Sequence, residues 1–132
     1  MPAEGRRMSR VGIVEDDAGC RRALARLLRA SGQVPVTFGS AEEYLRSAGE
    51  VDVDCLVVDV QLGGMSGFEL QKRLAGTETA PPVVFLTAAD EDEASRRAAA
   101  AGCAFVRKSA PAGELLHAIQ EAVVAGPTHP KV

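Results

Sequence analysis

The sequence predicts a doubly wound α/β domain, in which helices cover both faces of a five-stranded parallel sheet. Short apolar runs, typical of strands buried on both faces, alternate with segments whose apolar residues recur at helical spacing. Five such strand–helix pairs follow one another without internal repeats. This alternation favours parallel strands joined by right-handed crossovers. The 132 residues suffice for one domain with a sizeable core.

Each predicted element has a local signal in the sequence. In chain order, the elements are a strand at 11–14, a helix at 18–30, a strand at 34–38, a short helix opened by Ser40 and ending near Gly49, a strand at 55–59, a helix opened by Ser66, a strand at 83–86 closing on Thr87, a helix capped by Asp90 and ended by Gly102, a strand at 103–106, and a helix at 112–125. The strands are the apolar runs, the first helix carries Leu24, Leu27 and Leu28 at helical spacing, and the fourth has a helix-forming alanine run at 98–101.

The predicted helix ends follow from capping residues. Ser40 with Glu43, and Ser66 with Glu69, are capping boxes. Glycines such as Gly32 supply the stop signals. In the fourth helix acidic residues precede basic ones, an order that complements the helix dipole.

Polar side chains stand where four of the predicted strands end. They are Glu15 and Asp16, Asp59, Thr87 and Lys108. In the flavodoxin-like strand order 2-1-3-4-5, strands one and three lie side by side at the switch point, so their terminal acids converge. We therefore expect these five side chains to share one crevice, with Asp59 as a nucleophile that accepts a phosphoryl group.

A cluster of carboxylates needs a cation. Two unit charges about 4 Å apart at an effective dielectric near 20 repel by ~4 kcal/mol. An all-oxygen ligand set suits Mg²⁺, which also contacts phosphate oxygens. Phosphorylation of Asp59 would add roughly −1.5 to −2 charges. The metal and Lys108 would offset this charge, and Thr87 would donate a hydrogen bond to a phosphoryl oxygen.

Five short motifs lie in the right order at the strand ends. They are Val-Glu-Asp-Asp (14–17), Leu-Val-Val-Asp (56–59), Gly-Met-Ser-Gly-Phe-Glu-Leu (64–70), Phe-Leu-Thr-Ala (85–88) and Phe-Val-Arg-Lys (105–108). With these motifs, residues 11–125 resemble the receiver domain of bacterial response regulators, the CheY-like domain of two-component systems. The resemblance implies a signalling domain that catalyses only its own phosphorylation and dephosphorylation, and is not otherwise an enzyme.

The resemblance also implies a role for each site residue. Asp59 would be the phosphoacceptor, phosphorylated by a sensor histidine kinase or a histidine phosphotransfer protein. Asp16 and Asp59 would bind Mg²⁺ directly, Glu15 through water, and Gln61 through its backbone carbonyl; Mn²⁺ could substitute.

The choice within the acidic triplet rests on spacing. The family places an arginine five residues after the second acid, and Arg21 stands in that relation to Asp16. Asp17 would then cap the following helix.

In the family, a threonine and an aromatic residue form the switch, and here these are Thr87 and Phe105. A phosphoryl oxygen that draws Thr87 inward would vacate space for Phe105 and bias a two-state element. The surface of the fourth helix, fifth strand and fifth helix would report the switch to an output domain or partner, or form a phosphorylation-dependent homodimer.

The sequence departs from the family pattern at two positions. Ser109 replaces the usual proline after the strand-five lysine. A cis bond there would cost ~3 kcal/mol more than trans, and the sequence leaves the cis or trans state of the Lys108–Ser109 bond open. Gly63 replaces the customary proline four residues after the phosphoacceptor, which should loosen that loop.

Other functions stay open or are disfavoured. An aspartate-nucleophile phosphohydrolase needs an acid two residues after the nucleophile, where this chain has Gln61. A pseudo-receiver that binds proteins independently of phosphorylation is the alternative that the two departures support. A nucleotide-binding domain is disfavoured, because no glycine fingerprint follows the first strand.

Composition indicates which partners and which cellular compartment the domain has. A net charge of −3, with dispersed Lys and Arg, gives no sign of direct nucleic-acid binding, and no apolar run approaches the ~18 residues of a membrane span. Three cysteines without metal-ligand spacing are expected to be small buried hydrophobes in a reducing cytoplasm. We expect a flexible leader at 1–9, the receiver domain at 10–126, and a tail or linker start at 127–132, belonging to a stand-alone receiver or to the front of a longer regulator.

Overall fold

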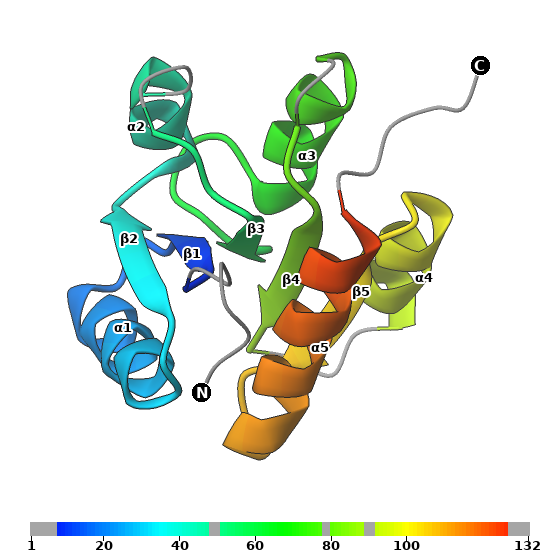
Figure 1. Cartoon of the computed structure of the whole chain (residues 1–132). Coiled ribbons are helices and arrows are strands. Elements are labelled where there is room, and N and C mark those ends of the chain that lie inside the picture. Colours follow the sequence, from blue (N-terminus) through cyan, green and yellow to red (C-terminus); the bar gives the residue numbers. More distant parts are fainter. Residues whose placement is uncertain (1–7, 48–50, 78–79, 89–91, 127–132) are drawn as a thin grey trace.

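Five parallel strands form one sheet in the order β2-β1-β3-β4-β5 in the computed structural model (Figure 1). The structure describes residues 8–47, 51–77, 80–88 and 92–126. The strands are β1 (Arg10–Val14), β2 (Val34–Phe38), β3 (Cys55–Asp59), β4 (Val83–Thr87) and β5 (Ala104–Arg107). The predicted strand order is confirmed, and so is the doubly wound fold.

Helices follow the strands one by one. They are α1 (Ala18–Ala30), α2 (Ala41–Ser47), α3 (Gly67–Ala75), α4 (Asp92–Ala100) and α5 (Ala112–Ala125). The predicted bounds of α1 and α5 are confirmed. The expected end of α2 near Gly49 and the Asp90 cap of α4 lie outside the described residues.

The fifth strand begins one residue later than predicted. We expected it at 103–106, but the backbone N–H of Cys103 donates to the carbonyl of Ala98 and so completes the C-terminal turn of α4. Gly102, at φ +74°, makes this turn. The turn therefore delays the strand to Ala104.

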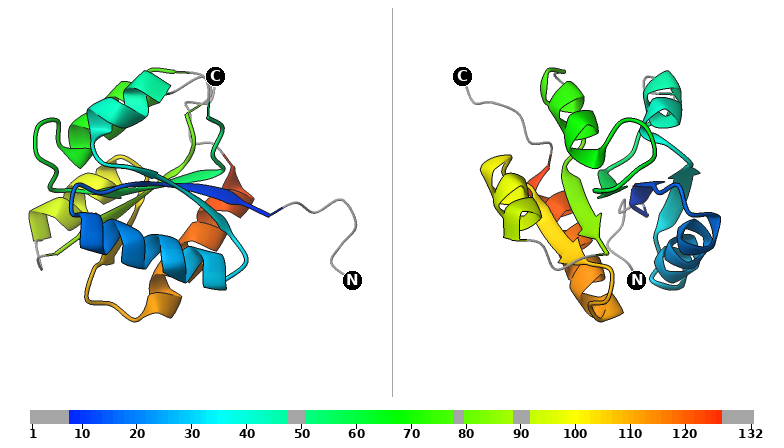
Figure 2. Two further views of the ribbon diagram at one scale, coloured as in Figure 1. Left: turned by 90° about the vertical axis from the view of Figure 1, so that its left-hand side faces the viewer. Right: turned by 180° about the vertical axis from the view of Figure 1, so that it is seen from behind.

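Helices lie on both faces of the sheet (Figure 2), and one apolar cluster fills the space between sheet and helices on each face. Alternate strand residues such as Val14, Val58 and Phe85 pack with α2, α3 and α4 on one face. The residues between them, such as Ile13 and Val57, pack with α1 and α5 on the other face. The two-residue period of a strand thus supplies both cores from the same apolar runs.

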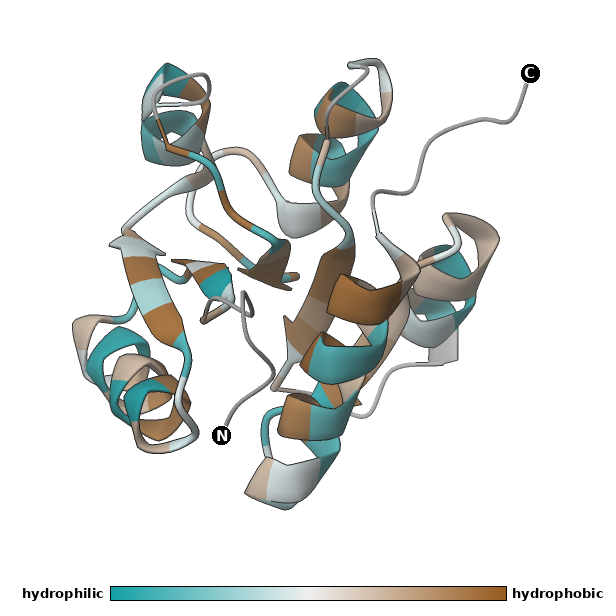
Figure 3. Cartoon of the chain, viewed as in Figure 1, coloured by the Kyte–Doolittle hydropathy of each residue, from teal (hydrophilic) through white to brown (hydrophobic). Residues whose placement is uncertain are grey.

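The central strands β3 and β4 are buried along their whole length, and both are brown in the hydropathy view (Figure 3). This burial explains why the sequence shows continuous apolar runs there rather than alternation. Within the described part of the chain, no helix has the length and apolar character that would let it cross a membrane.

The start of α3 lies directly against the end of β3. The amide of Gly67 donates to the carbonyl of Val60, and a Cβ at position 67 would collide with the backbone carbonyl of Asp59. Only glycine permits this close approach. The capping box predicted at Ser66 and Glu69 is present.

At α2 the predicted capping box takes a modified form. The hydroxyl of Ser40 accepts from the amide of Glu43 at 3.0 Å, as expected. The Glu43 carboxylate reaches back one residue further than predicted, to the amide of Gly39 at 2.8 Å.

The cysteines are only partly as expected. Cys55 is buried, but Cys20 and Cys103 are half-buried, so the prediction of three buried thiols was wrong for two of them. Cys20 lies on α1 at the edge of the core, and Cys103 belongs to the turn after α4 rather than to a strand.

Candidate functional site

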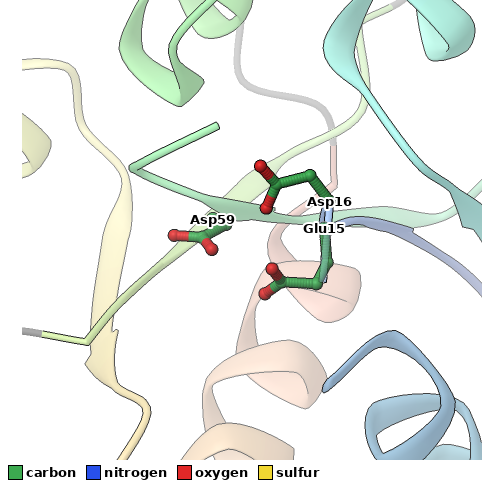
Figure 4. A group of neighbouring side chains, drawn as sticks. All are labelled: Glu15, Asp16 and Asp59. Atoms are coloured by element: carbon green, nitrogen blue, oxygen red, sulfur yellow. The ribbon is translucent and has the colours of Figure 1, made fainter. Parts of the chain in front are cut away.

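Three acids meet at the carboxyl end of the sheet. Glu15 and Asp16 follow β1, and Asp59 is the last residue of β3. These strands are neighbours in register, with Val14 opposite Val58. One oxygen of each carboxylate lies within 4.8 Å of one from each of the others, and all three groups point into the same space (Figure 4). The expected convergence of these carboxylates is therefore present.

Lys108, just after β5, reaches the same place. Its ammonium lies 2.7 Å from Oε1 of Glu15 and 2.8 Å from Oδ2 of Asp59. Its backbone amide donates to the carbonyl of Thr87 at 2.7 Å, which ties the loop to the end of β4. The Lys108–Ser109 peptide, whose state the sequence left open, is trans, and the lysine reaches both carboxylates.

Burial makes the electrostatics of this group unusual. Burial and the negative Glu15 raise the pKa of Asp59 above its usual value, although hydrogen bonds from Lys108 and Gln61 oppose this. For Glu15, burial acts to raise the pKa, but Lys108 and the Asp17 amide outweigh it, so the pKa is lowered. Burial likewise acts against the charge of Lys108, yet its two carboxylate partners raise its pKa.

Helix α1 is anchored to the acidic triplet. Asp17 is its N-cap, as predicted, and accepts from the amide of Cys20 at 2.7 Å. The Arg21 guanidinium donates to the backbone carbonyl of Glu15 at 2.7 Å. The Asp17 amide donates to the Glu15 carboxylate at 3.1 Å. Glu15 is therefore held through its main chain and side chain, whereas Asp16 is exposed.

The connection from β3 to α3, which we call the β3–α3 loop (residues 60–66), also contacts the acids. The amide of Gln61 donates to Oδ1 of Asp59 at 3.0 Å. The amide of Gly63 donates to Oδ2 of Asp16 at 3.1 Å. With Lys108 on Oδ2, both oxygens of Asp59 have a donor.

Thr87 and Phe105 lie on the two strands that run toward Lys108. Thr87 ends β4 and is 1% exposed. Phe105 is half-buried on β5, opposite Phe85 of β4, and packs against the core shared with α2, α3 and α4. The two residues thus stand on neighbouring strands, with Thr87 at the level of Arg107.

Sequence reasoning missed two side chains and one amide at this site. Cys20 lies beside Glu15, and burial together with this carboxylate raises its thiol pKa to about 11. Glu42 of α2 accepts from the amide of Met65 in the β3–α3 loop at 3.1 Å. The contact of the Gly63 amide with Asp16 has no signal in the sequence, because every residue except proline carries the same backbone N–H. Only the helical position of Cys20, one turn after the acids, gave any signal in the sequence.

The donor set fits a hard divalent cation. Three carboxylates face one ammonium, so the group carries excess negative charge. Mg²⁺ binds oxygens at about 2.1 Å, which places opposite ligands about 4.2 Å apart. One oxygen of each carboxylate lies within 4.8 Å of one oxygen of each of the other two, a separation close to that of two opposite ligands. Among the described residues, the acidic cluster thus has the chemistry and the dimensions of a magnesium site.

Comparison with known proteins agrees with this fold. A sequence model of the response regulator receiver domain matches residues 11–120, and the chain therefore belongs to this family of two-component signalling domains. Nodulation protein W of Bradyrhizobium diazoefficiens is 39% identical over 110 residues, which are 83% of this chain and 48% of that protein. Response regulator protein TmoT of Ectopseudomonas mendocina is 32% identical over 116 residues, covering 87% of this chain and 53% of that protein. The chain thus spans about half the length of these relatives.

Solved structures show the same fold. A response regulator receiver protein from Burkholderia phymatum superposes with a TM-score of 0.77 at 35% identity, covering 93% of this chain and 99% of that one. The crystal structure named FixJ-N superposes with a TM-score of 0.83 at 28% identity, covering 90% of this chain and 96% of that one.

Proposed function

We propose that this receiver domain accepts a phosphoryl group on Asp59 from a sensor histidine kinase or a histidine phosphotransfer protein. The observation that carries the proposal is the ammonium of Lys108 placed between Glu15 and Asp59 at the carboxyl edge of the sheet. A buried carboxylate beside a fixed cation is suited to gain negative charge, because the cation is already in position when the charge arrives. Asp59 is 5% exposed and is the last residue of β3, at the carboxyl edge of the sheet.

The reaction is a phosphoryl transfer between two side chains. An oxygen of Asp59 attacks the phosphorus of a phosphohistidine, and the O–P bond forms as the N–P bond breaks. The electron pair of the broken bond stays on the ring nitrogen, and uptake of a proton from solvent gives the neutral imidazole. Dephosphorylation reverses the state of Asp59: a water oxygen attacks the phosphorus, inorganic phosphate leaves, and the carboxylate is restored. Lys108 offsets the added charge of roughly −1.5 to −2, and Thr87 donates a hydrogen bond to a phosphoryl oxygen.

The acidic cluster would hold Mg²⁺, for which Mn²⁺ could substitute. Asp16, Asp59 and the backbone carbonyl of Gln61 would bind the ion directly, and Glu15 would bind it through water. When bound, the ion neutralises charge on the transferring phosphoryl oxygens. Asp16 is exposed and Asp59 is buried, so the chain would offer the ion one carboxylate at the surface and one enclosed by the protein.

Phosphorylation would be read on the surface formed by α4, β5 and α5. Thr87 is buried at the end of β4, and the half-buried Phe105 lies on the neighbouring strand. Movement of Thr87 toward a phosphoryl group would free space for Phe105 and shift the population of this surface. The surface would then bind an output domain or partner, or form a phosphorylation-dependent homodimer.

We also propose that residues 10–126 form the receiver unit. The described elements run from Arg10 to Ala125, and the family match covers 11–120. Because the relatives are about twice as long, residues from 127 onward would lead toward an output domain in a regulator of that length.

Incubation with acetyl phosphate and Mg²⁺, followed by intact-mass measurement, tests the proposal. We expect a single phosphoryl adduct on the chain, absent from Asp59→Asn and absent when EDTA replaces Mg²⁺. Beryllofluoride with Mg²⁺ should bind the parent chain and not Asp59→Asn. Failure of both reagents to modify or bind the parent chain would overturn the proposal and favour a pseudo-receiver, whereas turnover of a phosphoester substrate would favour a phosphohydrolase.

A further inference from the structure

Three alternate amides of the β3–α3 loop each donate to a carboxylate from a different part of the chain. The Gln61 amide donates to Asp59 of β3, the Gly63 amide to Asp16 after β1, and the Met65 amide to Glu42 of α2. These distances are 3.0, 3.1 and 3.1 Å. The loop therefore bridges two acids of the metal site and one acid outside it.

The loop conformation brings the third carboxylate close. Gly64 has φ +94°, a backbone angle that residues with a side chain rarely adopt. It turns the chain between the amides of Gly63 and Met65. A Cβ at Gly64 would lie 3.1 Å from Oε2 of Glu42. Glu42 is half-buried and directly contacts the turn. The position of the Gly63 amide is thus set from two sides, by Asp59 at one end and by Glu42 at the other.

The Gly63 amide restricts the one carboxylate of the site that is otherwise free to rotate. Asp16 is exposed, and its Oδ2 accepts from Gly63 47 residues away. An ionised carboxylate has two oxygens and about four lone-pair positions, so Oδ1 stays available to a cation. Outer hydrogen bonds of this kind orient metal ligands, and their loss typically weakens metal binding by 10- to 100-fold.

We propose that the Gly63 amide is a positioning group that holds Asp16 for the metal ion, and that Glu42 on α2 acts through Met65 to anchor the loop that carries this amide. The inference rests on the proposed metal site and adds to it a main-chain donor and a remote carboxylate. It also links α2 to metal occupancy, since Glu42 touches the loop without being a ligand itself.

Replacing Gly63 tests the amide directly. Gly63→Pro removes the N–H donor, whereas Gly63→Ala keeps it, and an added Cβ meets only Asp16 Oδ2 at an ordinary 3.6 Å. We expect Mg²⁺ to bind Gly63→Pro about 10-fold more weakly than the parent chain, with Gly63→Ala within about twofold of it. Mg²⁺ affinity is measured by calorimetric titration and by amide chemical shifts in ¹⁵N-labelled protein. Equal affinity in the proline and alanine variants overturns the proposal.

A second variant leaves Gly63 in place. Glu42→Ala should weaken Mg²⁺ binding by about threefold, because it acts one hydrogen bond further from the ligand. In the metal-free protein it should also move the Gly63 amide resonance, by releasing the Met65 end of the loop. Glu114→Ala, an exposed acid in the first turn of α5, is the matched control for charge and should change neither quantity. An unmoved Gly63 resonance in Glu42→Ala overturns the anchoring role even if Gly63→Pro does not fold.

The parent chain separates this inference from the proposed function. If the parent chain does not bind Mg²⁺ at all, the proposed metal site fails. If it binds Mg²⁺ and all variants bind equally, only the positioning role of the loop fails.

Discussion

The Nζ of Lys108 donates a hydrogen bond of 2.8 Å to Oδ2 of Asp59, which lies 49 residues away in the sequence. The same ammonium is 2.7 Å from Glu15, so one cation serves two buried carboxylates. This arrangement stabilises the fold only while the lysine is present, and it leaves the acidic cluster with excess negative charge.

Removing the lysine should destabilise the metal-free domain. Lys108→Ala leaves Glu15 and Asp59 buried without their cation, and we expect a loss of about 2 kcal/mol in the free energy of unfolding, less than for a fully buried pair because the lysine side chain is 25% exposed. Urea denaturation with EDTA at pH 7 measures it. The pKa of Lys108 is raised in the folded chain above its ordinary value of 10.5. The difference in unfolding free energy between parent and Lys108→Ala should therefore be constant below pH 10.5 and disappear as the pH rises through the folded pKa. Lys72→Ala, an exposed lysine of α3, is the control, and equal stabilities of the two variants would contradict the prediction.

Asp59→Asn should stabilise the metal-free domain at neutral pH. The folded-state pKa of Asp59 is raised, mainly by burial, so its ionised form disfavours folding above that pKa. The asparagine variant lacks this cost and should melt a few degrees higher at pH 7. The advantage should shrink as the pH falls through the raised pKa of Asp59 in the folded chain. It should vanish below 3.8, the ordinary aspartate pKa, because the parent aspartate is then protonated in both the folded and the unfolded chain. Thermal unfolding across this pH range checks the sign, and a variant that melts lower than the parent at pH 7 would exclude it.

Mg²⁺ should raise the unfolding temperature, and above its dissociation constant the rise should follow the logarithm of the Mg²⁺ concentration. An ion that binds only the folded chain at 100 times its dissociation constant adds about 2.7 kcal/mol. We expect EDTA to reverse the effect and Asp16→Asn to abolish most of it. Calorimetry with increasing Mg²⁺ provides the measurement, with Ca²⁺-free buffers and the Glu114→Ala chain as controls. A melting temperature independent of Mg²⁺ in the parent chain is the contrary result.

Gly67→Ala should destabilise the domain by about 1 to 3 kcal/mol, the usual cost of overpacking. Its Cβ would collide with the backbone of Asp59, which cannot move without disturbing β3. The matched control is Gly113→Ala in α5, where a Cβ meets open space and should stabilise by up to about 1 kcal/mol. Chemical denaturation of both variants tests the pair, and a Gly67→Ala chain as stable as the parent would show that α3 can shift at no cost.

The thiols should react slowly in the native state. Burial raises the pKa of Cys55 to about 12, and burial with the neighbouring Glu15 raises that of Cys20 to about 11. Since only the thiolate is nucleophilic, alkylation at pH 7.5 should be far slower than that of a free thiol with pKa ≈ 8.5. Mass spectrometry after timed iodoacetamide treatment follows the rate. In urea all three cysteines should react within minutes, and equally rapid labelling of folded Cys55 would refute its burial.

The sequence alone determined the succession of strands and helices, the strand order, and the residues that stand at the strand ends. These follow from local patterns: apolar runs, capping boxes and glycine stops are properties of neighbouring residues. The rule that parallel strands present their carboxyl ends at one edge then places Glu15, Asp59 and Lys108 together without any coordinates. The start of β5 was harder to predict from the sequence, because the amide of Cys103 donates to the carbonyl of Ala98 and so belongs to the turn after α4.

Only the tertiary structure decided how the site is held. The Gly63 amide on Asp16, the Met65 amide on Glu42, and the single ammonium shared by two carboxylates join segments whose separation depends on loop geometry. Hydrogen bonds require donors and acceptors within about 3 Å, a precision that residue patterns do not carry. The pattern along the chain therefore names the chemical groups, and the packing of loops against one another sets which of them touch.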